Sequence, residues 1–219
     1  MREKFNIGFF FIYFIVFSSL LINSAIGEEG KKNINLDTKV KRFLESHRGQ
    51  WKDWNIPEVD AKVLYDLIIL NNYKKAVDIG TSTGHSAIWM AWALSKTGGK
   101  LITIEIHEGR YKKALANFKE AGLTEYIDAR LADAHELVRK LEGPFDFVFS
   151  DADKEWYKNY FIALAPKLKV GGCFTAHNVS WRSDSGIKAF LNHVRSLPNF
   201  ETRIDRSSQQ GISISYKKW

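Results

Sequence analysis

Two kinds of hydrophobic spacing alternate along most of the chain. Apolar runs of four to six residues predict β-strands, and the segments between them carry apolar residues at helical intervals. The expected strands are Ala76–Ile79, Lys100–Glu105, Ile127–Leu131, Phe145–Ser150 and Cys173–His177. The expected helices are one starting near Asp37, then Val59–Asn71, Ser86–Leu94, Glu108–Ala121, His135–Leu141 and Trp156–Leu168. This alternation predicts an α/β fold with a mostly parallel sheet, covered on both faces.

The rhythm changes near the C-terminus. After an expected helix over Ser185–Leu197, two apolar runs follow, Phe200–Asp205 and Gly211–Tyr216, joined by a polar turn. Two strands linked in this way favour an antiparallel pair. We therefore expect parallel strands in most of the sheet and an antiparallel pair formed by its last two strands.

The first 27 residues follow a pattern of their own. Two basic residues precede an apolar run from Phe5 to Ile22, and small residues follow the run before Glu28. This order is typical of a secretory signal peptide. An uncleaved membrane anchor is the alternative, because the run has 18 residues and a spanning helix needs about 20. We expect a signal peptide or anchor over residues 1–27, a single domain over residues 28–219, and a protein that is exported or held at a membrane.

The composition of the chain excludes several classes of protein, of site and of partner. Of the 219 residues 45% are hydrophobic, which is enough for a sizeable core and excludes a disordered or collagen-like chain. Cys173 is the only cysteine, so an intrachain disulfide and a zinc site of several cysteines are excluded. The net charge of +7 comes from dispersed pairs of basic residues without interleaved aromatics. Nucleic acid is therefore not expected as a partner.

Candidate chemistry lies where the expected strands end, the edge at which open parallel sheets bind ligands. The first strand leads into a turn with Gly80 and Gly84, where a ligand can approach the backbone. The next strand ends in Glu105, whose carboxylate can accept both hydroxyls of a ribose. These features indicate a nucleoside-bearing cofactor. Ser82 stands where a pyrophosphate needs glycine, and Asp78 would repel a pyrophosphate but suits a cationic ligand.

Two later strand ends carry Asp151 and the pair His177-Asn178. The tips of neighbouring parallel strands lie side by side, so these residues could converge on one cation. Oxygen ligands suit magnesium, manganese or calcium, whereas an imidazole moves the preference toward zinc, nickel or iron. Each residue alone also has a structural explanation, because aspartate caps helices and a single histidine is often a hydrogen-bonded core residue.

The stretch from Asn55 to Trp181 resembles the cation-dependent catechol and caffeoyl-CoA O-methyltransferases and their bacterial relatives. The matching segments are Asn55–Glu58, Val77–Ser86, Glu105, Ala132–Ala134, Asp151–Lys154, Gly171–Gly172 and Asn178-Val179-x-Trp181. The resemblance implies a Rossmann-like class I fold, a seven-stranded sheet with an antiparallel last strand, and a homodimer. It also implies S-adenosylmethionine (SAM) as methyl donor and a small, hydroxylated, catechol-like molecule as acceptor.

The resemblance also implies roles for individual residues. The cofactor-binding residues would be Asp78, Gly80, Ser82, Gly84, Ser86, Glu105, Asp133 and Asp151. Within this set Glu105 would bind the ribose and Asp133 would lie on the adenine side. Lys154 and Asp151 would be catalytic, with Lys154 as the base. Asp151, His177 and Asn178 would hold a divalent metal.

Two residues depart from the family pattern. His177 stands where the family usually has an aspartate ligand, and His85 where the cofactor loop usually has tyrosine. An imidazole in place of a carboxylate removes a negative charge from a hard-cation site, so a softer metal or none becomes an open alternative. Without a metal, Lys154 or His177 would carry the proton transfer. The functional alternative is an exported protein of the same fold that binds SAM or NAD without this catalysis.

Overall fold

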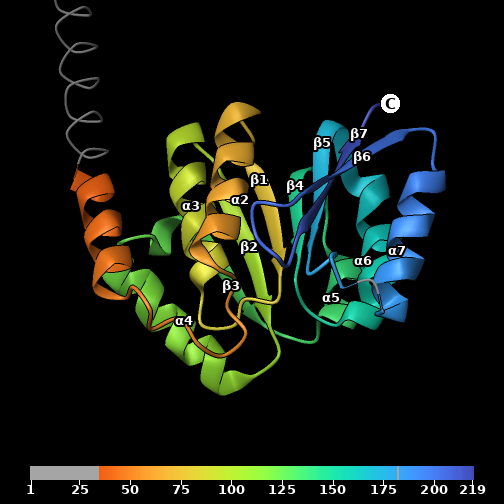
Figure 1. Cartoon of the computed structure of the whole chain (residues 1–219). Helices are drawn as coiled ribbons and strands as arrows, with labels where there is room; N and C mark the ends of the chain where they lie inside the picture. The colour runs from red at the N-terminus through yellow and green to blue at the C-terminus, as the bar shows by residue number, and fades with distance from the viewer. Residues whose placement is uncertain (1–34, 182) are drawn as a thin grey trace, which may run out of the picture.

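A seven-stranded sheet forms the centre of the molecule (Figure 1). The structure, a computed structural model, describes residues 35–181 and 183–219. The strands are β1 (Lys75–Ile79), β2 (Lys100–Glu105), β3 (Ile127–Leu131), β4 (Phe145–Ser150), β5 (Leu168–His177), β6 (Phe200–Asp205) and β7 (Ile212–Lys217). They lie in the order β3-β2-β1-β4-β5-β7-β6, in which β1 to β5 are parallel and β7 is antiparallel to both neighbours. The predicted sheet with an antiparallel last strand is confirmed.

Helices cover both faces of this sheet (Figure 1). One face packs against α2 (Glu58–Leu70), α3 (His85–Thr97), α4 (Glu108–Ala121) and the helical residues 35–46. The other face packs against α5 (Ala134–Lys140), α6 (Tyr157–Leu164) and α7 (Ser185–Ser196). Successive side chains of a strand point to opposite faces. Accordingly Phe147 and Phe149 of β4 belong to the first hydrophobic cluster and Val148 to the second.

The helix α3 is the most deeply buried helix of the first layer. Eleven of its 13 side chains are buried, because α2 and the helical residues 35–46 cover the side that faces away from the sheet. Trp92 donates its indole N–H to Asp37 Oδ1 at 2.6 Å, which ties the N-terminal helical segment to α3. The cofactor loop at the start of α3 is therefore held by packed structure.

Most predicted boundaries lie within three residues of the observed ones, and two differ by more. β5 begins at Leu168, five residues before the predicted start, and its pairing with β4 shifts register between Phe145 and Phe147. The exposed residues 169–171 obscure the strand in the sequence because they interrupt its apolar run. The helix predicted through Leu168 is also wrong at its end. α6 stops at Leu164 and a 3-10 turn over Ala165–Lys167 follows, since Pro166 has no amide hydrogen with which to continue the helix.

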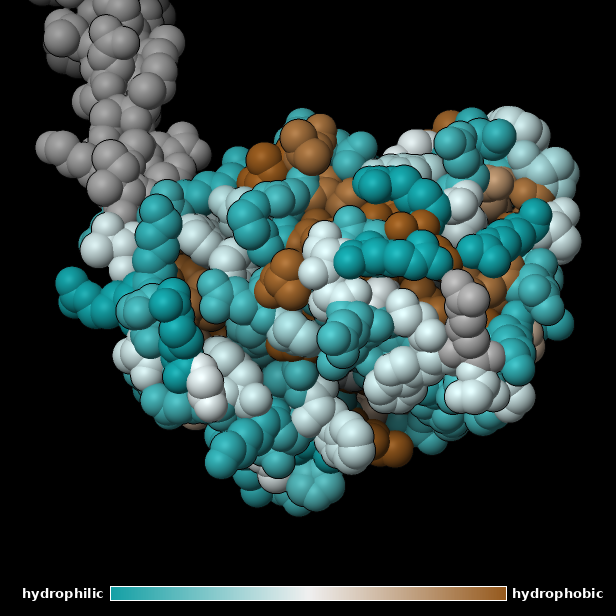
Figure 2. All heavy atoms as spheres, viewed as in Figure 1, coloured by the Kyte–Doolittle hydropathy of each residue, from teal (hydrophilic) through white to brown (hydrophobic). Residues whose placement is uncertain are grey.

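The surface is mainly polar. Figure 2 shows hydrophilic residues over most of the face in view, with hydrophobic residues exposed at the upper end of α2. Leu70, the last residue of that helix, is 81% exposed. Among the described residues no helix is long and apolar enough to cross a membrane. The predicted signal peptide or anchor, residues 1–27, lies outside the described residues.

Candidate active site

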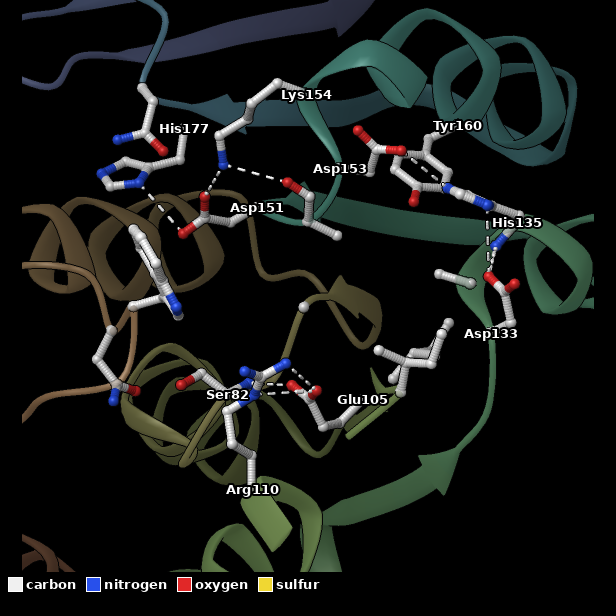
Figure 3. A pocket seen from close by; sticks show the side chains of 18 of the residues that line it. Ser82, Glu105, Arg110, Asp133, His135, Asp151, Asp153, Lys154, Tyr160 and His177 are labelled. Atoms are coloured by element: carbon white, nitrogen blue, oxygen red, sulfur yellow. Dashed lines mark hydrogen bonds and ion pairs between the residues drawn. The ribbon is translucent and has the colours of Figure 1, made fainter. Parts of the chain in front are cut away.

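A cavity of about 650 Å³ opens at the carboxyl ends of the five parallel strands (Figure 3). Every one of these strand ends contributes lining residues, and so does the segment just before β7. The predicted site residues that line the cavity are Gly80, Ser82, Glu105, Asp133, Asp151, Lys154, His177 and Asn178. Residues separated by almost a hundred positions therefore face one space, as expected for strand ends that meet at one edge of a sheet.

Three predicted cofactor residues do not line this cavity: Asp78, Gly84 and Ser86. Asp78 is completely buried, and its carboxyl group accepts hydrogen bonds from Thr103 Oγ1 at 2.8 Å and Ser86 Oγ at 3.3 Å. Burial, with the negative charges of Asp151 and Glu105 nearby, raises the pKa of Asp78 to about 8. Asp78 is thus neutral at pH 7 and lies behind the cofactor loop.

Gly80 allows two strand-end loops to touch. Its φ of +104° lies in the left-handed region that favours glycine. A Cβ atom at this position would lie 2.6 Å from the carbonyl oxygen of Asp151. The loop after β1 therefore sits directly against the loop after β4, which brings the cofactor loop beside Asp151.

The backbone amides of the cofactor loop are already engaged within the protein. The amide of Ser82 donates to Glu105 Oε2 at 2.7 Å, and the amides of Gly80 and Thr81 both donate to the carbonyl of Ile104. The amide of Gly84 donates to Thr81 O, and that of His85 to Asn55 Oδ1. A pyrophosphate needs free loop amides, so this arrangement does not favour a dinucleotide.

Glu105 lines the cavity next to the predicted cofactor loop, and its side chain is 4% exposed. Its Oε1 accepts hydrogen bonds from Arg110 Nη2 at 2.9 Å and from the His107 amide at 2.8 Å. These contacts fix the direction of the carboxylate. Oε1 also accepts from Arg110 Nε at 3.2 Å, whereas Oε2 accepts from the Ser82 amide and has a further lone pair for a ligand hydroxyl. Arg110 was missed by the sequence analysis, because a basic residue early in an exposed helix carries no distinguishing pattern.

The third strand end forms a polar and aromatic wall. Asp133 caps α5 by accepting the amide of His135 at 2.8 Å. The His135 ring stacks on Trp156 with centroids 3.9 Å apart and reaches Asp153 Oδ2 at 3.3 Å. His135 was also missed, since nothing in the sequence pairs it with Trp156. A flat, heteroaromatic ligand would fit beside this wall.

The opposite side of the cavity carries a chain of charged groups (Figure 3). Lys154 Nζ contacts Asp151 Oδ1 at 2.8 Å, and Asp151 Oδ2 lies 3.2 Å from His177 Nδ1. His177 Nε2 contacts Asp60 Oδ2 at 2.8 Å. Burial lowers the pKa of His177, but its hydrogen bonds to Asp151 and Asp60 and their charges outweigh burial and raise it to about 9. Asp60 was missed because an aspartate in the first turn of a helix is an ordinary helix-terminus residue.

The predicted metal ligands do not fit a divalent cation in this arrangement. A ligand must offer a lone pair, and both ring nitrogens of His177 already face carboxylates. Both oxygens of Asp151 are engaged, by Lys154 and by His177, whereas the contact of Asn178 Nδ2 with Gln210 Oε1 at 3.3 Å does not involve the ligating atom Oδ1. Within residues 35–181 and 183–219, no group of three or more His, Cys, Asp or Glu side chains is placed to hold a metal ion.

Known proteins of similar sequence match most of the chain. An O-methyltransferase family profile matches residues 32–189. Caffeoyl-CoA O-methyltransferase 1 of Eucalyptus globulus is 32% identical over 158 residues, which cover 66% of this chain and 64% of that protein. Caffeoyl-CoA O-methyltransferase of Zinnia elegans is 31% identical over 174 residues, which cover 73% and 69%. The first of these matches thus spans somewhat less than two thirds of its relative.

Solved structures show the same architecture. The O-methyltransferase from Bacillus cereus in complex with SAH aligns with a TM-score of 0.72 at 23% identity, over 83% of this chain and 91% of that chain. An O-methyltransferase of Streptomyces achromogenes in complex with SAM aligns with a TM-score of 0.70 at 22% identity, over 83% and 90%. At these identities the likeness concerns the fold, which is that of the class I methyltransferases. Because the family profile covers well over half of its length, the chain belongs to the O-methyltransferase family.

Proposed function

We propose that the protein transfers a methyl group from SAM to a hydroxyl group of a small aromatic acceptor. The observation that carries this proposal is the placement of Glu105 and the Lys154–Asp151 pair on opposite sides of one cavity (Figure 3). Relatives named for caffeoyl-CoA and for flavonoids support a phenolic acceptor. Glu105 would bind the ribose hydroxyls, and the Asp133 and His135 wall would lie along the adenine.

The cofactor loop favours SAM over the NAD alternative. Its amides donate to Glu105, Ile104, Thr81 and Asn55, so a pyrophosphate would have to displace these bonds. SAM carries no phosphate, so it can bind while these amides keep their hydrogen bonds within the protein. Its sulfonium charge would instead lie near the carboxylate of Asp151, which lines the same cavity.

The reaction needs an acceptor oxygen in line with the S–CH₃ bond and a group that takes the hydroxyl proton. The new O–CH₃ bond forms as the S–CH₃ bond breaks, and the sulfonium becomes a neutral thioether. Lys154 in its amine form would accept the proton, since Nζ lines the cavity beside Asp151. Trp181, which also lines the cavity and is 47% exposed, offers an aromatic face to the acceptor ring. No step of this reaction requires a bound metal ion.

Binding and turnover test the proposal separately. Calorimetry of the full chain should show saturable SAM binding and none with NAD at the same concentration. Labelled methyl groups should pass from SAM to members of a catechol panel. Absence of SAM binding at millimolar concentration would refute the proposal. SAM binding without transfer to any acceptor would favour the non-catalytic alternative.

A lysine substitution tests the assigned base. Lys154→Met should lower turnover by about 10²- to 10⁴-fold while SAM binding persists, because general acid–base catalysis typically contributes that factor. Lys158→Met is the matched control, since Lys158 is exposed on α6 and does not line the cavity. Equal turnover in both variants would remove Lys154 from the mechanism.

A further inference from the structure

A buried, ion-paired histidine lies on the side of the cavity that carries Lys154 and Asp151, which we call the acceptor side. His177 is the last residue of β5, and its side chain is 3% exposed. Nε2 lies 2.8 Å from Asp60 Oδ2, and Nδ1 lies 3.2 Å from Asp151 Oδ2. The two carboxylate side chains are 1% and 9% exposed, so water competes little for these contacts.

The hydrogen-bond roles of these groups fix the charge of the ring. An ionised carboxylate only accepts hydrogen bonds, so a ring nitrogen that contacts one must carry a proton. Both nitrogens of His177 lie within hydrogen-bond distance of carboxylate oxygens, an arrangement that suits the imidazolium form, in which both nitrogens donate. Asp60 is held in place by Ser208, whose Oγ donates to the same Oδ2 at 2.8 Å.

Replacing a carboxylate ligand by this charged ring changes the charge of the site as much as binding a divalent metal would. A carboxylate ligand contributes −1 and an imidazolium contributes +1, so exchanging one for the other changes the site by +2. A divalent cation contributes the same amount. The positive charge also touches Asp151, the residue that would otherwise ligate the metal.

We propose that the imidazolium of His177, clamped between Asp60 and Asp151, occupies the place of the divalent cation of the enzymes that this chain resembles. The proposal rests on the proposed methyl transfer. The fixed charge stabilises the oxyanion that forms when the acceptor hydroxyl loses its proton. Asp60 is a positioning residue that acts through His177.

Lys154 complements this fixed charge. Its Nζ bonds to Asp151 Oδ1 at 2.8 Å and to the Ala152 carbonyl at 3.2 Å. Once it has taken the acceptor proton it is an ammonium with three N–H donors, of which two are used within the described part of the chain. The third is available to the acceptor oxygen. The protein thus supplies both the charge and the directed hydrogen bond that orient an acceptor.

Manganese titration of the full-length protein tests the proposal without relying on activity. Electron paramagnetic resonance should detect no saturable Mn²⁺ binding by the wild type at millimolar concentration, and EDTA should leave turnover unchanged. One Mn²⁺ bound per wild-type chain and lost in Asp151→Asn, or turnover abolished by EDTA and restored by Mn²⁺, would overturn the proposal.

A carboxylate restored at residue 177 tests the place of the cation. Folded His177→Asp should bind one Mn²⁺ per chain, while His193→Asp on α7, outside the cavity, should bind none. A folded His177→Asp variant without Mn²⁺ binding would contradict the proposal. Should that variant not fold, nitrogen-15 NMR of the wild-type ring decides, because a singly protonated ring would also overturn it. Failure of the methyltransferase function itself would appear as absent SAM binding, which leaves the Mn²⁺ titration and the NMR spectrum interpretable.

Discussion

His85 shows how hydrogen bonds select one protonation state of a side chain. Its Nδ1 faces the carbonyl of Ile56 at 2.8 Å, and Trp89 donates its indole N–H to Nε2 at 3.1 Å. The ring therefore carries its proton on Nδ1, has none on Nε2 and is neutral. It also stacks on Trp51 with centroids 4.4 Å apart. Burial lowers the pKa of His85 to about 4.

The neutral His85 predicts a loss of stability in acid. Between pH 6.5 and about pH 4 the unfolded chain binds a proton that the folded protein excludes, so the free energy of unfolding falls as the pH falls. The loss from this residue should reach about 3 kcal/mol at most. Urea denaturation at pH 7, 5.5 and 4.5 measures it. His85→Gln should flatten the dependence, and His193→Gln should not; equal slopes in wild type and His85→Gln would contradict the assignment.

Gly80 predicts a second effect at the scale of one residue. Gly80→Ala should weaken SAM binding at least about tenfold and cost more stability than backbone strain alone, about 1–2 kcal/mol, because the new Cβ meets Asp151 O. Gly98→Ala is the matched control, since Gly98 also has a positive φ but has nothing within 4 Å of its Cβ position. Calorimetry and denaturant unfolding of both variants measure the difference. If the two variants lose the same stability, the contact between the loops is not tight.

The cavity residues that lie at strand ends were identified from the sequence. Residues such as Asp60, which reach the site from other parts of the chain, were missed. Glu105, Asp151 and Lys154 were predictable because strand ends of a parallel sheet share one edge. Asp60 meets His177 across 117 positions, a contact that no local pattern reveals. Asp78 was expected to face the ligand, but its side chain is buried behind the loop. The direction of a strand side chain depends on how the strand is oriented in the sheet, which the local sequence does not reveal.

At the scale of elements, α7 supports the loop that carries Lys154, the proposed base. Asp184 caps this helix by accepting the amide of Ile187 at 2.9 Å. Ser185 donates to Glu155 Oε1 at 2.7 Å, and Gly186 lies against the backbone of Lys154 too closely for a side chain. The start of α7 therefore fixes the loop that carries Lys154.

Removing this cap should affect stability and turnover together. Asp184→Ala should cost about 1 kcal/mol of unfolding free energy, the usual value for a lost N-cap, and lower turnover through a looser Lys154 loop. Asp184→Asn retains an accepting oxygen and should behave like the wild type. Denaturant unfolding and turnover measured on the same preparations check both effects. A stability loss with unchanged turnover would separate α7 from the catalytic loop.

The elements whose bounds the sequence predicted best are four strands. β2, β3, β4 and β6 match their predicted bounds, although β3 and β6 are the half-exposed edge strands of the sheet. The start of β5 escaped prediction because Lys169 is polar and Gly171 and Gly172 resemble a turn. The strand starts before them because Leu168 pairs with Phe145 of β4, a contact that a local pattern does not contain.

At the scale of the whole molecule, the N-terminal segment makes a prediction about location. A chain produced in bacteria with residues 1–27 intact should be recovered outside the cytoplasm, with Glu28 as its first residue, because a basic start, an apolar run and a small-residue exit direct export and cleavage. N-terminal sequencing of the fractionated protein measures this. Lysine in place of Phe11 and Phe14 should block export. Full-length protein in the membrane fraction would favour the anchor instead, and a SAM enzyme in either location needs a supply of its cofactor.

The position of β7 determines when the site can be completed. This strand follows the other six in the sequence, yet it lies between β5 and β6. The segment before it delivers Ser208 to Asp60 across 148 positions and places Gln210 at the cavity. A chain that lacks these residues presents β5 as an open edge and cannot close the charged cluster around His177. Pairing of β7 with β5 therefore closes the edge of the sheet and brings Ser208 and Gln210 to the site together.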